Sequence, residues 1–111
     1  MLFTCAEDFF EKASKIPRLS REDEKHLYLQ MKAGDLDARE RLIMGYLPLV
    51  ASRIRRLSPD MQSLEFIYGN IRTLEKTVDA FDFLQEGEAF RHRLSLVLQQ
   101  NVARYIAGVF P

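Results

Sequence analysis

Apolar residues recur at steps of three and four along nearly the whole chain, which is the spacing of an α-helix that buries one face. No segment alternates apolar and polar residues as a half-buried strand would, and no repeat or low-complexity tract interrupts the pattern. We therefore predict an all-α fold, a compact bundle of about five to seven helices. The two clearest rows are Leu64, Ile67, Tyr68, Ile71, Leu74, Val78 and Phe81, and then Phe90, Leu94, Val97, Leu98, Val102 and Tyr105.

Local signals predict where the first helices begin and end. Thr4 and Glu7 are spaced as a capping box ahead of the first helix, and Ser20 is placed to cap the second. Gly34 supplies a left-handed stop, and the Asp35 side chain is placed to accept from a backbone N–H two or three residues on. We therefore expect a sharp corner at Gly34-Asp35, with no linker between the two helices.

Length and composition indicate one domain in a reducing compartment. The 111 residues, 47% of them hydrophobic, suffice for one compact core. The start, MLFTCAEDFFEK, has acids where a signal peptide has bases, and no apolar run approaches the roughly 20 residues needed to cross a bilayer. Cys5 is the only cysteine, so it cannot form an internal disulfide. We expect a cytoplasmic protein with a single domain over residues 1–111.

The residues that would carry enzymatic chemistry do not form a recognisable pattern. The sequence has no glycine-rich phosphate loop, no pair of histidines at metal-ligand spacing and no serine elbow. His26 lies beside the apolar stripe of its helix and is better explained as a surface or boundary residue. We therefore predict a protein that is not an enzyme, with no catalytic residue, no metal site and no cofactor.

The charges are balanced in number but not in position. Sixteen basic and sixteen acidic residues give a formal net charge of zero, which argues against binding nucleic acid by bulk charge alone. However, Arg53, Arg55 and Arg56 stand together, and no acid follows Glu88. This distribution favours a polyanionic partner about as much as an ordinary solvated helix face, and charge alone leaves both open.

A family resemblance lies in the segment LSREDEKHLYLQMKAGDLDARERLIMGYLPLVASRIRR, about a third of the chain. It resembles bacterial RNA polymerase sigma factors of the housekeeping type, and it implies their clamp-binding and promoter-melting helical domain. Residues 1–18 would be an N-terminal helix and residues 19–111 the sigma-like part, with the family's second DNA-reading domain absent. The matching positions are Leu19-Ser20, Ala33-Gly34-Asp35, Ala38-Arg39, Leu42-Ile43 and Leu47-Pro48-Leu49-Val50.

The resemblance extends more faintly into EFIYGNIRTLEKTVDAFD, which matches the helix that binds the clamp coiled coil of the polymerase in that family. Core RNA polymerase is therefore an expected partner. Phe66 lies more than 90° from the apolar stripe of its helix, as a partner contact would, although burial against another segment is the alternative. The implied polymerase-binding residues are Glu65, Phe66, Gly69, Asn70, Arg72 and Lys76.

In the same family the last helix melts the promoter and holds the unpaired strand. Here this helix is expected from about Glu88 to Ala107, after a loop around Gly87. The family's tryptophan pair falls at Leu96 and Val97, and the chain contains no tryptophan. The implied contacts to single-stranded promoter DNA are Arg91, His92, Arg93, Leu96, Gln99, Gln100 and Arg104.

Two other functions stay open on the sequence. The chain could be a regulatory or decoy module that keeps the fold and the protein interface but has lost promoter melting. An anti-sigma protein or a companion sigma subunit would then be a further partner. Alternatively, it could be a structural helical domain without polymerase contact. The missing tryptophans favour the regulatory module, whereas the basic last helix favours residual DNA contact.

Overall fold

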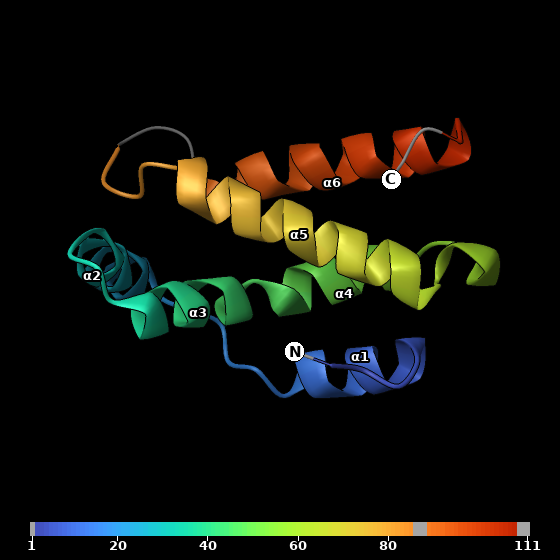
Figure 1. Ribbon diagram of the computed structural model, residues 1–111, viewed down its shortest axis with the longest axis horizontal. Coiled ribbons are helices and arrows are strands. Elements are labelled where there is room, and N and C mark those ends of the chain that lie inside the picture. Colours follow the sequence, from blue (N-terminus) through green and yellow to red (C-terminus); the bar gives the residue numbers. More distant parts are fainter. Residues whose placement is uncertain (1, 86–88, 109–111) are drawn as a thin grey trace.

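The computed structural model describes residues 2–85 and 89–108. The regular elements among these residues are all helices, with no strand, which confirms the predicted all-α fold (Figure 1). None of the described helices is long and apolar enough to cross a membrane. The helices are α1 (Ala6–Ser14), α2 (Arg21–Lys32), α3 (Leu36–Gly45), α4 (Leu47–Arg55), the short 3-10 helix η1 (Pro59–Met61), α5 (Leu64–Ala80) and α6 (Phe90–Ile106).

The corner between α2 and α3 forms as predicted. Gly34 has φ of 99°, a conformation that favours glycine because it has no Cβ. The Asp35 carboxylate then accepts hydrogen bonds from the backbone N–H of Asp37 at 3.0 Å and of Ala38 at 3.2 Å. Two of the N–H groups left open at the start of α3 are thus satisfied without a linker.

The cap of α2 is confirmed and that of α1 is not. Ser20 accepts from the Asp23 N–H, and the Asp23 carboxylate accepts in return from the Ser20 N–H, which completes a capping box. The predicted box of Thr4 and Glu7 is wrong, because α1 begins after Cys5 and has no side-chain cap. The N–H of Thr4 instead donates to the Asp8 carboxylate at 3.0 Å, one helical turn further on.

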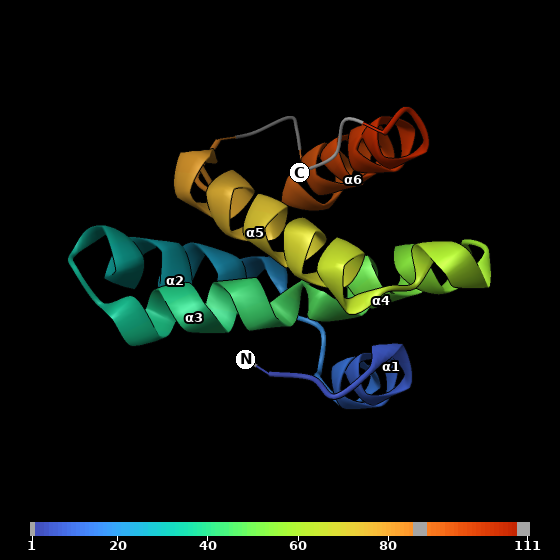
Figure 2. The same ribbon diagram turned by 45° about the vertical axis from the view of Figure 1, so that its right-hand side comes forward.

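The helices pack as a hairpin with two outer helices. α2 and α3 fold back on each other across the Gly34-Asp35 corner (Figure 2), and α5 crosses α3 and α4 (Figure 1). α1 covers α4 on one side of the molecule, and α6 lies on α5 at the opposite side, as Figure 2 shows from a second direction. The predicted DNA contacts all lie on α6, so the surface that carries them is formed by α6 and the helices beside it.

Aromatic rings fix the start of α6 against the hairpin. The Phe90 ring lies 4.6 Å from Tyr46, 4.8 Å from Phe83 and 5.1 Å from Phe81, measured between ring centroids. Such edge-on and offset contacts add to the energy of burying the rings. The described part of the last helix begins here at Phe90, whereas the predicted loop at Gly87 and the predicted start at Glu88 lie outside the described residues.

Candidate interface on helices α5 and α6

A buried polar network joins α5 to α6. The side-chain amide of Asn101 donates to Asn70 Oδ1 at 3.0 Å and to Thr73 Oγ1 at 2.8 Å. Asn70 donates in turn to the Phe66 carbonyl at 2.8 Å. Both asparagines are almost fully buried. Because polar groups this deep are costly unless they are paired, the network specifies how α6 sits along α5.

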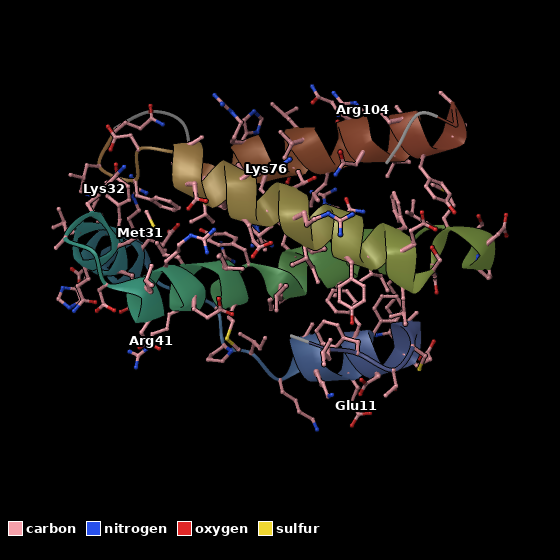
Figure 3. The ribbon with its side chains drawn as sticks, in the orientation of Figure 1. Glu11, Met31, Lys32, Arg41, Lys76 and Arg104 are labelled. Atoms are coloured by element: carbon pink, nitrogen blue, oxygen red, sulfur yellow. The ribbon has the colours of Figure 1, made fainter. Side chains whose placement is uncertain are left out.

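Beside this network, the two helices form a cleft of about 340 Å³. Lys76 on α5 and Arg104 on α6 both belong to it, and Figure 3 labels the two on their helices. Hydroxyl and amide groups also line the cleft, and Val97 and Phe81 supply apolar wall. The lining residues are Thr73, Lys76, Thr77, Ala80, Phe81, Arg93, Val97, Gln100, Asn101 and Arg104.

The charge of the cleft is positive. Of the lining residues that the structure describes, three are basic and none is acidic. Among residues 2–85 and 89–108, the ion pairs are Lys12–Asp8, Lys15–Glu11, Arg39–Asp79 and Arg41–Asp37, so neither Lys76 nor Arg104 is neutralised in this way. A concave surface lined by one sign of charge concentrates ligands of the opposite sign. The cleft is therefore suited to an anionic group with hydrogen-bond acceptors.

The structure divides the predicted DNA-binding residues between two sides of α6. Arg93, Gln100 and Arg104 line the cleft toward α5. Arg91 instead lines a separate hollow of about 210 Å³, together with Arg18 and Arg21. Gln99 is exposed on the Arg91 side, and the exposed positions between the two sides are His92 and Leu96, of which Leu96 is 43% exposed.

Half of the predicted polymerase-binding set, Phe66, Gly69 and Asn70, is buried in the structure. Phe66 has no exposed surface, and its ring packs 4.6 Å from the Tyr105 ring of α6. Gly69 and Asn70 are buried beneath the same helix junction. Phe66 falls outside the stripe of its own helix because α5 is covered from two directions, by α3 and α4 and by α6. The alternative of burial against another segment is the one observed.

The remaining half of that set stays accessible. Glu65, Arg72 and Lys76 are exposed, and their spacings of seven and four residues place them on one side of α5. Lys76 also lines the cleft with the α6 residues, so it connects the predicted polymerase surface to the predicted DNA surface.

Sequence reasoning missed the polar residues that fall on apolar rows. Asn101 lies between Leu94, Leu98 and Tyr105 on the inner side of α6, and an asparagine at such a position signals a buried partner. Thr73 and Thr77 were missed for another reason, because their hydroxyls donate within α5, to the carbonyls of Gly69 at 3.1 Å and of Thr73 at 2.7 Å. Thr73 and Thr77 line a cleft only because α6 packs beside α5.

A second missed pair lies under the Arg91 hollow. The Tyr46 hydroxyl donates to the buried Glu24 carboxylate, linking the junction of α3 and α4 to α2. Burial raises the pKa of Tyr46 well above its usual range, and the neighbouring carboxylate raises it further. The phenol therefore stays protonated at every physiological pH and keeps donating.

Within the described residues, no group of His, Cys, Asp and Glu side chains is arranged to hold a metal ion.

Two curated proteins resemble the chain across most of its length. It is 30% identical over 95 residues to the "Putative RNA polymerase sigma-G factor" of Bacillus thuringiensis subsp. kurstaki, an alignment that covers 84% of this chain and 74% of that protein. It is 33% identical over 100 residues to RNA polymerase sigma factor SigA of Clostridium acetobutylicum, covering 89% of this chain but 26% of SigA. The chain thus spans about a quarter of that second relative.

No family model matches the chain, and no solved structure matches it. Both relatives are named as RNA polymerase sigma factors, the same family that the segment from Leu19 to Arg56 resembles. The alignment covers 74% of the sigma-G relative at 30% identity, which is enough to assign the two proteins to one family. The chain belongs to the family of RNA polymerase sigma factors.

Proposed function

We propose that this chain acts in transcription initiation as a cytoplasmic, non-enzymatic sigma-factor domain that binds core RNA polymerase and the unpaired strand of a promoter. The observation that carries the DNA part is the cleft between α5 and α6, which is basic and has no acid among its described lining residues. Family membership supports the polymerase part.

For the DNA contact, the residues of the cleft supply the chemistry that a strand requires. Lys76 and Arg104 are placed to neutralise phosphates, and Gln100 offers both a donor and an acceptor to a base edge. Leu96 is exposed beside the cleft and adds an apolar contact. The buried Asn70–Asn101 pair holds the two helices that carry these groups in register.

For the polymerase contact, the accessible row on α5 replaces the set inferred from the sequence. Glu65, Arg72 and Lys76 are exposed, whereas Phe66 cannot reach a partner without moving Tyr105. An interface built on this row would be governed by charge, so its on-rate should fall as salt rises.

The polymerase contact is tested by immobilising the chain and measuring binding of core RNA polymerase from the same organism. Arg72→Glu should weaken binding about tenfold or more, because reversing the charge at the proposed contact would replace attraction by repulsion. Arg41→Glu is the matched control, since Arg41 is an exposed arginine on α3 with its side chain 68% exposed. Equal losses in both variants would refute the α5 surface, and no binding by the unmodified chain would favour a structural helical domain.

One observation favours a second candidate, a regulatory or decoy module that binds the polymerase, an anti-sigma protein or a companion sigma subunit without melting promoters. Leu96 and Val97 occupy the positions where the family resemblance places tryptophans, and neither can stack on a base, a contact worth about 1–3 kcal/mol. This candidate expects equal affinity for a promoter-like strand and a scrambled strand. A preference of about tenfold or more in fluorescence anisotropy would favour the initiator.

A further inference from the structure

Opposite the cleft, the other side of α6 is joined to α4 through an arginine. Arg53, near the end of α4, donates from Nη2 to Ser95 Oγ at 3.1 Å. The Ser95 hydroxyl donates in turn to the Arg91 carbonyl at 2.9 Å, one turn earlier on α6. Arg53 is therefore held against the turn of α6 that carries Arg91, although both side chains are exposed.

Donors continue along this side of α6. Arg91, Ser95 and Gln99 follow one another at steps of four residues, so they form one row along the helix. The residues that line the cleft, Arg93, Gln100 and Arg104, lie on the other side of the same helix. We define Arg53, Arg91, Ser95 and Gln99 as the α4 flank.

No acidic residue offsets the charge of the α4 flank from its own helices. α4 (Leu47–Arg55) contains no Asp or Glu, and neither does α6 (Phe90–Ile106). Toward the start of α6 the positive charge continues, because Arg91 shares its hollow with Arg18 and Arg21. The acid in that hollow, Glu24, is buried and accepts from Tyr46.

We propose that the α4 flank binds backbone phosphates of the same single strand that enters the cleft, so that the strand crosses α6 over Leu96. This inference rests on the proposed function and extends it to residues on α4. Guanidinium, hydroxyl and amide donors without apolar anchors are the groups that proteins direct at phosphates rather than at bases or at acidic protein surfaces. From Arg91 to Arg104 the helix rises about 20 Å, so only a strand of several nucleotides reaches both sides.

The test compares two oligonucleotides, of about 4 and about 15 nucleotides, by fluorescence anisotropy at about 50 and 200 mM salt. Variants are Arg104→Gln in the cleft, the pair Arg53→Gln/Arg91→Gln in the flank, and Arg41→Gln as the control. Arg41 carries the same charge but lies on α3, on the side turned away from α6 in Figure 3. Circular dichroism confirms that each variant is folded.

The flank variant should bind the short strand as the unmodified chain does and should lose affinity for the long strand. Losing two phosphate contacts lowers the salt slope by about 1.4, so the loss should be about sevenfold larger at 50 mM than at 200 mM. Ser95→Ala should give part of this loss and Ser95→Thr should restore it, because the hydroxyl positions Arg53.

Three results would overturn the inference, and they are distinguishable from failure of the proposed function. If Arg104→Gln weakens binding but the flank variant does not, the cleft binds DNA alone and the inference fails. If Arg41→Gln causes an equally large loss of affinity, the effect of the flank variant is due to net charge alone. If the chain binds an acidic peptide as strongly as the long strand, the flank is a protein-binding surface. If the unmodified chain binds neither strand, the DNA part of the proposed function fails first.

Discussion

Replacing Asn101 by leucine should destabilise the domain by about 2 kcal/mol, even though the two side chains have similar shapes. Asn101 supplies the donor at 3.0 Å from Asn70 Oδ1, and Asn70 is 1% exposed, so no water can replace that donor. A buried acceptor left without a partner costs about 1–3 kcal/mol, which exceeds the gain from burying the more apolar leucine.

The matched experiment is a double-mutant cycle with Asn70→Leu. Removing both amides leaves no orphaned group, so the variant with both leucines should be more stable than Asn101→Leu alone, by about 1 kcal/mol or more. In thermal unfolding, about 4 °C corresponds to 1 kcal/mol for a chain of this length. Additive losses in the cycle, or a single variant as stable as the unmodified protein, would refute the reasoning that the network fixes α6 on α5.

Three further changes test the fold around this site. Asp35→Ala should cost about 1 kcal/mol in denaturant unfolding, since it removes the cap of α3, whereas an unchanged midpoint would contradict the capping role. Gly45→Ala should cost about 1–3 kcal/mol, because the added Cβ would lie 2.6 Å from Leu19 Cγ, and Leu19→Ala in the same chain should recover part of that loss. Hydrogen bonds from the Arg39 guanidinium hold the pKa of Asp79 below its usual range, so this carboxylate stabilises the fold above the unfolded pKa of about 3.9 and stops doing so as pH falls through its lower folded pKa. Asp79→Asn should therefore lower Tm at pH 6 and lower it progressively less as the pH falls below about 3.9, and a loss that does not change with pH would exclude the ion pair as the cause.

The features that could be predicted from the sequence are those decided within one or two turns of helix. The Gly34-Asp35 corner and the Ser20 cap depend on backbone N–H groups at most three residues away. The Thr4–Glu7 box failed at the same range, because Asp8 competes for the Thr4 N–H. Local patterns thus identify candidate partners, and small differences in helix start decide among them.

Features that depend on the packing of distant helices could not be predicted. Phe66 has polar neighbours in its own helix, and its burial depends on residues far along the chain, such as Tyr105, 39 positions later. The cleft likewise combines Lys76 with Arg93 and Arg104, which the sequence assigned to separate partners. Helical periodicity describes each helix alone, so a surface shared by two helices is outside its reach.

The central claim, that DNA lies in the α5–α6 cleft during initiation, is tested most directly by site-specific crosslinking. A photoreactive amino acid placed at Gln100 lines the cleft, and one placed at Arg41 serves as the control on α3. With core RNA polymerase and a promoter fragment present, the probe at position 100 should crosslink to DNA and the probe at position 41 should not. Crosslinks from position 100 to polymerase alone, or equal DNA yields from both positions, would contradict the claim.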